Sequence, residues 1–262
     1  MISLGSRRSH SAPEPSDDGI LPADDLSWDS GDASRALHTS VSTPLSEPQP
    51  TFARMCQAAM LISRTAMITQ SDSATEEQLH YAFEALSEEI CGFTKMLEDK
   101  MTHETPSQMF ENLRPCSIAW SALYLLLDRI CCPEKLADEA GYVVTGSAKS
   151  PMQVRMQGRA AQLTVEISQK GAAMADFLGL KLSAASELDF TSDKLGPFCL
   201  DSLYCAMLSL HWLHREQGDA SHRSDLKTLA KCFVVYGRRW NLGNTYLSLS
   251  ERYDAFNSEI ET

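Results

Sequence analysis

The sequence predicts an all-α protein, with a multi-helix bundle-like domain preceded by a disordered N-terminal segment. Apolar residues recur every three or four positions over long stretches, which is typical of amphipathic helices. No run of alternating polar and apolar residues bounded by turn residues is long enough to predict a strand. The composition changes near residue 50, so we expect disorder over 1–50, a helical domain over 51–256 and a tail over 257–262.

The overall composition excludes several classes of protein. The 262 residues are 43% hydrophobic, enough for one good-sized core or two small ones. Because phosphate binding depends on Lys and Arg, the net charge of -12 predicts no direct DNA binding by this chain alone. No apolar run resembles a signal peptide or a membrane span. The eight cysteines lie mostly within helical patterns, which favours reduced, buried thiols in the cytosol or nucleus.

The first 50 residues hold six of the eleven prolines, eight acidic residues and three basic ones. Such a segment buries too little apolar surface to offset the entropy of ordering, so we expect it to be disordered. Within it, residues 20–29 interleave aspartates with large apolar residues. One interpretation is an activation-type patch that folds on a partner, and the other is a solvated linker. The composition favours the linker.

Three helices are expected in the first half of the ordered domain. The first covers 51–70, and the second starts at Thr75, where Thr75 and Gln78 fit a capping box. An apolar stripe with spacing of three and four supports this second helix as far as residue 97. The third helix is expected between the prolines at 115 and 133. It is almost entirely apolar, so we place it at the centre of the core.

The middle of the chain combines a break with a long helix. Residues 133–150 predict a break, with a short helical turn over 134–140. A long helix over 151–178 follows, with Ser150 as its N-cap and a proline in its first turn. Residues 179–195 then form a polar connection.

Residues 196–249 are expected to form two linked helices at the heart of the domain. The first opens after Gly196-Pro197 and is apolar on almost every side, which predicts burial on most sides. Gly218 is expected to stop it. The second helix starts near Ser224 and carries an unbroken seam along one face. The seam residues are Leu226, Leu229, Phe233, Tyr236, Trp240, Gly243 and Leu247.

The densest set of metal-ligating residue types is Cys199, Cys205, His211, His214 and His222. A structural zinc site needs four ligands that converge tetrahedrally. The two cysteines are six positions apart, which separates them by about 120° around a helix. They do not share a face, so we interpret the set as buried thiols and surface histidines.

Two further sets resemble catalytic motifs. Cys131 and Cys132 are better explained as small core residues than as a redox pair, because no Cys-x-x-Cys is present. Asp24, Asp25 and Asp29 have the spacing of the aspartate motif with which all-α terpene synthases hold magnesium. That chemistry needs carboxylates on a rigid helix wall. These aspartates lie instead in the Pro- and Ser-rich segment, without a second metal motif downstream.

Arg238, Arg239 and Trp240 place two cations beside an aromatic ring, an arrangement that can stack or bind an anion. We favour an interpretation in which Trp240 belongs to the seam and the arginines flank it in solvent. Glycine loops for phosphate, nucleophile elbows and metalloprotease motifs are missing from the sequence. We therefore expect no enzyme, and no catalytic, cofactor-binding or metal-binding residues.

The helical domain carries an ordered set of short motifs. They are FARMCQAAMLI at 52–62, SIAWSALYLL at 117–126, LGPF at 195–198, LYCA at 203–206, WLHREQG at 212–218, the leucines of 226–229, RW at 239–240 and YLSL at 246–249. In order and spacing this set resembles the fungal-specific transcription factor domain, the helical regulatory region of fungal zinc-cluster transcription factors. The resemblance covers about residues 51–255.

The resemblance implies a non-catalytic regulatory domain that acts in RNA polymerase II transcription control in a fungal nucleus. The partners it implies are proteins of the transcription machinery, a homodimer is also compatible with it, and no cofactor is expected. Family members also carry a DNA-binding module in which six cysteines hold two zinc ions. Residues 1–50 contain no cysteine, so the family's zinc ligands match no residue here. We therefore expect either part of a longer factor or a relative without this module.

Two other functions stay open at this point. A general helical scaffold for protein binding is one, although no repeat of fixed period is present to favour it. An all-α enzyme that binds magnesium through the early aspartates is the other and weaker alternative.

Overall fold

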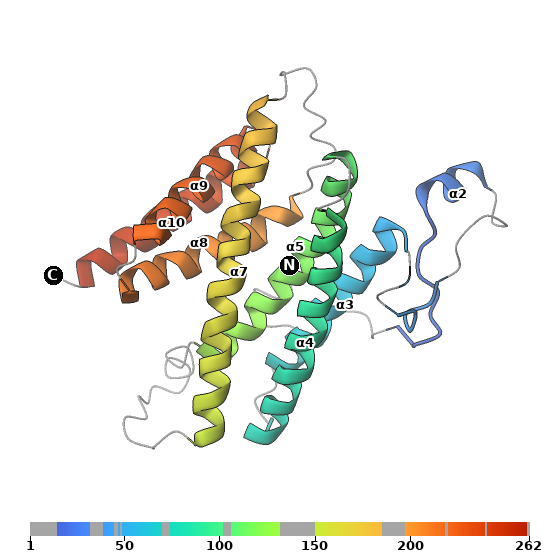
Figure 1. Ribbon diagram of the computed structural model, residues 1–262, viewed down its shortest axis with the longest axis horizontal. Helices are drawn as coiled ribbons and strands as arrows, with labels where there is room; N and C mark the ends of the chain where they lie inside the picture. Colours follow the sequence, from blue (N-terminus) through green and yellow to red (C-terminus); the bar gives the residue numbers. More distant parts are fainter. Residues whose placement is uncertain are drawn as a thin grey trace. The chain divides into compact units, whose positions relative to one another are not determined.

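The computed structural model of the protein describes residues 15–31, 39–44, 47, 49–69, 74–101, 106–131, 150–184, 197–217, 220–238 and 240–260 (Figure 1). Every regular element in these ranges is an α-helix, which confirms the predicted fold class. The helices are α2 (Asp25–Ser30), α3 (Thr51–Thr69), α4 (Glu76–Met101), α5 (Pro106–Cys131), α7 (Pro151–Ala184), α8 (Phe198–Gln217), α9 (Ala220–Gly237) and α10 (Asn241–Ile260).

The chain divides into two compact units, Met1–Gln157 and Gly158–Thr262, with the boundary inside α7. The predicted break at 133–150, apart from Ser150, lies outside the described residues, as do the turn at 134–140 and Gly218.

The core of the first unit forms where α5 packs against both α3 and α4 (Figure 1). Side chains of α4 that are wholly or almost wholly buried face it at the predicted spacing of three and four. They are Phe83, Leu86, Ile90, Phe93 and Leu97. From α5 the core receives Leu113, Cys116, Ala119, Ala122, Leu126 and Leu127. The predicted central place of this helix is confirmed.

The predicted start of α5 at Pro115 is wrong, because the helix begins at Pro106, about two and a half turns earlier. Pro106 occupies the first helical position, where its missing N–H costs nothing. Pro115 lies inside the helix and cannot donate to the carbonyl of Glu111. Leu113 is 1% exposed, so the apolar face continues upstream of Pro115, and its burial offsets the lost hydrogen bond.

The predicted capping box at the start of α4 is confirmed. The backbone N–H of Thr75 donates to Oε1 of Gln78 over 2.9 Å. The N–H of Gln78 donates in return to Oγ1 of Thr75 over 3.2 Å. Two of the N–H groups that a helix start leaves without partners are thereby satisfied.

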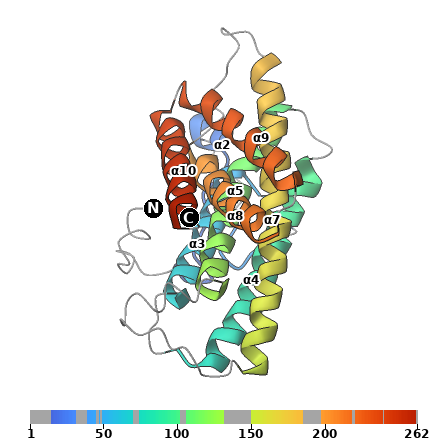
Figure 2. The ribbon, with the colours of Figure 1, turned by 90° about the vertical axis from the view of Figure 1, so that its left-hand side faces the viewer.

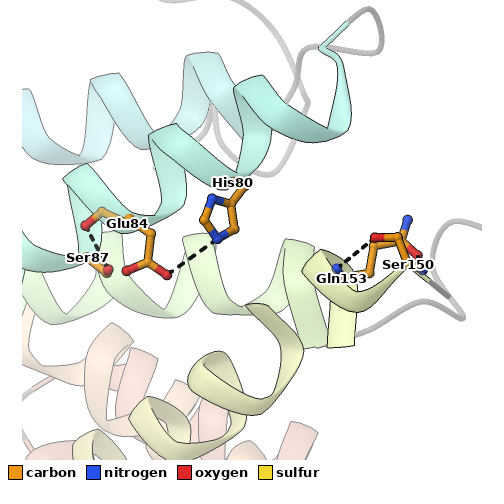
Figure 3. A network of polar contacts seen from close by, with 5 residues as sticks. All are labelled: His80, Glu84, Ser87, Ser150 and Gln153. Carbon is orange, nitrogen blue, oxygen red and sulfur yellow. Dashed lines mark hydrogen bonds and ion pairs between the residues drawn. The ribbon is translucent and has the colours of Figure 1, made fainter. Parts of the chain in front are cut away.

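A second capping box starts α7 (Figure 3). The N–H of Gln153 donates to Oγ of Ser150 over 3.1 Å, and the N–H of Ser150 donates to Oε1 of Gln153 over 3.2 Å. Ser150 is therefore the N-cap, as predicted. Its hydroxyl also donates to the carboxylate of Glu76, so one side chain links the starts of α7 and α4.

The end of α7 differs from the prediction. The helix continues through Ala184 rather than ending near residue 178. Residues 179–184, which were predicted to belong to a polar connection, contain no proline that would stop the helix. The remainder of that connection, 185–195, lies outside the described residues.

In the second unit α8, α9 and α10 all contact one another. From Cys199 to His214 every residue of α8 is buried or half-buried, which confirms the predicted burial on most sides. In α7, Gly171 lies against α8 so closely that a Cβ there would be 2.8 Å from the Cβ of Ala206. The two helix backbones therefore need a glycine at this position.

The predicted unbroken helix over the seam is wrong, because α9 ends at Gly237 and α10 begins at Asn241 (Figure 2). The two helices approach closely at this turn. A Cβ on Gly243 would lie 2.8 Å from the backbone N of Gly237 and 2.9 Å from the carbonyl of Phe233. The side chain of Asn244 donates to the carbonyl of Gly237 over 3.1 Å. The seam residues are regularly spaced in the sequence, but the chain turns between two helices within the seam.

The N-terminal segment holds more local structure than its composition predicts. Residues 15–31 and 39–44 contain α2 and an isolated antiparallel bridge between Ile20 and Ser40. Leu21 is 5% exposed, and its N–H donates to the carbonyl of Thr39 over 2.8 Å. Residues 1–14 and 32–38 lie outside the described ranges.

Candidate interaction segment

The short helix α2 is held at both ends by its own capping groups. Oδ1 of Asp24 accepts a hydrogen bond from the N–H of Ser27 over 2.9 Å, and Oδ2 accepts one from the Ser27 hydroxyl over 2.7 Å. At the other end the N–H of Gly31 donates to the carbonyl of Trp28 over 3.1 Å. Gly31 has a φ of 66°, the left-handed conformation that glycine adopts without strain. Helices this short rarely persist without such caps.

Large apolar side chains in this segment face solvent. Leu26 is 83% exposed, Trp28 81% and Ile20 78%, the three highest values for large hydrophobic residues in the described part of the chain. Burying a side chain of this size stabilises by about 1.5–3 kcal/mol. Exposed apolar groups gathered in one short segment mark an interaction site more often than isolated ones do.

The segment is also strongly acidic. Residues 15–31 contain five aspartates and no lysine or arginine. Hydrogen bonds from Ser27 hold the pKa of Asp24 below its ordinary value, and the hydroxyl of Ser16 does the same for Asp18. These carboxylates therefore stay ionised at neutral pH. We call residues 20–31, with their exposed apolar side chains and aspartates, the acidic–apolar segment.

Among the described residues no group of three or more Asp, Glu, His or Cys side chains could hold a metal ion, and the side chain of Asp25 lies outside those residues. Both carboxylate oxygens of Asp24 are used to cap α2. Of the resembled magnesium motif, one member therefore has a structural role that the spacing alone did not indicate.

The metal-ligating residue types of α8 and α9, interpreted above as buried thiols and surface histidines, do not form a group that could hold a metal ion in the described part of the chain. Cys199 is 1% exposed, as predicted for a buried thiol, whereas Cys205 is only half-buried. His211 and His214 are half-buried, and Nε2 of His211 lies 3.0 Å from Oγ of Ser250 on α10. His222 is only 3% exposed, so its prediction as a surface histidine is wrong. Burial at this position is set by packing of α9, which periodicity alone did not show.

The other candidate residues are the cysteines at 131 and 132 and the group at 238–240. Cys131 is half-buried at the end of α5, while Cys132 lies outside the described residues. Arg238 is exposed and Trp240 half-buried, as expected of a seam residue flanked by an arginine. Arg239 is not among the described residues.

Arg54 on α3 is a buried cation that the sequence interpretation missed. Its side chain is 1% exposed. Nη1 donates to Oε1 of Gln57 over 3.1 Å, and Nη2 donates to the backbone carbonyl of Glu47. Burial lowers the pKa of this guanidinium. Arg54 therefore links the residues before α3 to the helix. The sequence signal for its burial was its position four residues before Ala58, which is also buried.

An aromatic cluster joins the helices of the second unit. The rings of Tyr204 and Tyr246 stack with centroids 4.4 Å apart, and Phe233 meets Tyr246 edge-on at 6.2 Å. The hydroxyl of Tyr246 donates to Oδ1 of Asp201 over 3.2 Å. Burial, followed by the charge of Asp201, raises the pKa of Tyr246. Residues from α8, α9 and α10 meet at this one point.

Burial also keeps nearby groups neutral. It raises the pKa of the Cys232 thiol to about 12, with a further contribution from Cys199. The pKa of Tyr236 is raised as well, first by burial. A thiol in this state is a packing group and a poor nucleophile.

Comparisons with models of protein families, with curated proteins and with solved structures find no match to this chain. In the described ranges, no helix combines the length and the apolar character needed to cross a bilayer.

Proposed function

We propose that this protein is a non-catalytic helical regulatory domain of a fungal transcription regulator. It is either part of a zinc-cluster factor or a relative without the DNA-binding module. It acts in RNA polymerase II transcription control in the nucleus, through contacts with other proteins. The observation that carries the proposal is the ordered set of motifs between residues 52 and 249.

The places of these motifs in the fold support the proposal. The motifs at 52–62 and 117–126 fall on α3 and α5, which pack against each other. In the second unit, Tyr204 of the motif at 203–206 stacks on Tyr246 of the motif at 246–249. A motif set that defines a domain through its packing is expected to supply the contacts between its helices. Tyr204 and Tyr246 supply such a contact between α8 and α10.

The protonation state of two buried side chains, Cys232 and Tyr236, agrees with a role of these residues in packing. Cys232 and Tyr236 are kept protonated by burial rather than activated for chemistry. General bases and nucleophiles require pKa values near the working pH or below it. These two side chains are shifted in the opposite direction.

A helical protein-binding scaffold without a role in transcription is the second candidate. The exposure of Leu26, Trp28 and Ile20 favours it, because binding to a protein would bury these side chains. The two proposals share the need for a protein partner. They differ in whether recruitment to a promoter changes transcription.

A tethering experiment separates the two candidates. The full chain is fused to an unrelated DNA-binding domain and expressed in fungal cells with two reporter genes, one of low and one of high basal expression. The first proposal predicts a several-fold change in at least one reporter relative to the DNA-binding domain alone. A helical protein of similar size and charge, fused in the same way, is the control. Unchanged output from both reporters, with the fusion nuclear and folded, would favour the scaffold.

A further inference from the structure

We propose that the acidic–apolar segment is a docking site for a protein whose surface offers two apolar pockets separated by lysine or arginine side chains. The proposal stands on the exposure, capping and charge of residues 20–31. It holds whether or not the chain acts in transcription.

The geometry of α2 defines the arrangement of the docking groups. Ser27 is 9% exposed, the lowest value among the residues of α2 whose side chains are described, and therefore marks the covered side of the helix. Successive residues of an α-helix are about 100° apart, so Leu26 and Trp28 flank Ser27 on opposite sides. Asp29 is exposed and lies about 160° from Ser27, on the outward side. The outward face thus presents a carboxylate between two large apolar side chains.

This arrangement is already formed in the free chain. Asp24 and Gly31 cap α2, and the N–H of Val41 donates to the carbonyl of Gly19 over 2.9 Å beside the bridge of Ile20. Leu21 is buried and its N–H donates to the carbonyl of Thr39, so the segment is attached to residues 39–44. Because the helical turn is preformed, a partner gains the contacts without the full entropic cost of ordering the segment.

Charge selects the class of partner. A second copy of the chain is disfavoured, since each copy carries a net charge of -12. Nucleic acids and anionic membranes would also repel the three aspartates of the segment. A protein surface with apolar pockets and basic side chains would bury the exposed apolar side chains and pair with the aspartates. The segment is short, so we expect a transient contact rather than an obligate complex.

Site-specific photo-crosslinking in the full chain tests the proposal. Trp28 is replaced by p-benzoylphenylalanine in fungal cells, and the cross-linked peptides are identified by mass spectrometry. The matched control places the same group at Tyr81, which is 77% exposed but lies on α4. We expect position 28 to give adducts with one main protein, through an apolar segment rich in lysine or arginine. Position 81 should not give these adducts.

Second substitutions test the two kinds of contact. Leu26→Ala and Asp29→Lys, each combined with the photo-reactive group at position 28, should lower the yield of the adduct about tenfold, as loss of an interface anchor does. Tyr81→Ala should leave the yield unchanged. All three side chains are exposed, so the helical circular dichroism and thermal transition of each variant should match those of the parent.

Several outcomes would overturn the proposal. The first is that the adducts form mainly with a second copy of the chain, with nucleic acid or with lipid, or through a protein segment rich in Asp and Glu. The second is that Leu26→Ala does not lower the adduct yield. The third is that position 28 gives no adduct beyond those of position 81. A basic partner found together with unchanged reporter output in the tethering experiment would remove the transcriptional function and leave the docking site.

Discussion

Tyr204 of α8 stacks on Tyr246 of α10, with ring centroids 4.4 Å apart and planes 8° from parallel. The hydroxyl of Tyr246 also donates to Oδ1 of Asp201, one turn before Tyr204. Tyr246 therefore attaches α10 to α8 through an aromatic contact and through a hydrogen bond to a carboxylate. Offset stacking and a charged acceptor are both stronger than the average contact of their kind.

Substitution of Tyr246 separates these two contributions. Tyr246→Phe keeps the ring and loses the hydrogen bond, and should lower the free energy of unfolding by about 1–2 kcal/mol. Tyr246→Ala also removes the stacking and should cost about 2–4 kcal/mol. Leu249→Ala, on the same helix at 41% exposure, is the control and should change stability by less than about 0.5 kcal/mol. Urea unfolding measures all three, and equal effects of Phe and Ala would contradict the stacking contribution.

Two glycines of α7 should respond to alanine with opposite signs. A Cβ at Gly171 would lie 2.8 Å from the Cβ of Ala206, so Gly171→Ala should destabilise by about 1–3 kcal/mol through overpacking. Nothing lies within 4 Å of a Cβ at Gly158, so Gly158→Ala should stabilise by about 1 kcal/mol through helix propensity. Thermal unfolding of the two variants decides between the signs. The double variant Gly171→Ala/Ala206→Gly should recover part of the loss.

Ser150 should matter more than an ordinary N-cap, because its hydroxyl caps α7 (Figure 3) and also donates to Glu76. Ser150→Ala should lower stability by about 1 kcal/mol or more and speed amide hydrogen exchange in the first turn of α7. Thr75→Ala, which removes a cap without such a link, is the matched control and should cost less. Equal losses for the two variants would show that the link to Glu76 adds nothing.

Stability should fall in alkaline solution. Burial raises the pKa of Cys232 to about 12, so the folded state keeps a proton that the unfolded state releases above the ordinary thiol pKa. The stabilisation is complete below the ordinary value and is lost as the pH rises toward 12. Tyr236 and Tyr246 act in the same direction. Urea unfolding at about pH 8, 9 and 10 under reducing conditions should show the decline, and Cys232→Ala should reduce its slope.

Local signals in the sequence predicted local structure well. The pairs Thr75–Gln78 and Ser150–Gln153 cap their helices because capping depends on residues within one turn. Asp24 and Gly31 cap α2 in the same local way, but the prediction used the composition of the whole segment and did not consider these caps. Apolar spacing likewise identified the buried face of α4.

Errors arose where tertiary contacts decided the outcome. Proline is a strong helix breaker locally, yet burial around Leu113 carries α5 through Pro115. The seam continued in the sequence across Gly237, where close packing against Gly243 turns the chain. The burial of His222 depends on packing in the same way. The composition of the acidic–apolar segment is visible in the sequence, whereas the exposure of its apolar side chains is visible only in the structure.

The central claim is that this chain regulates transcription through protein contacts, and the tethering experiment tests it most directly. With the full chain fused to an unrelated DNA-binding domain, we predict a several-fold change in reporter transcription relative to that domain alone. A fusion that is nuclear, folded and bound at the reporter, yet leaves both reporters at the level of the DNA-binding domain alone, would contradict the claim.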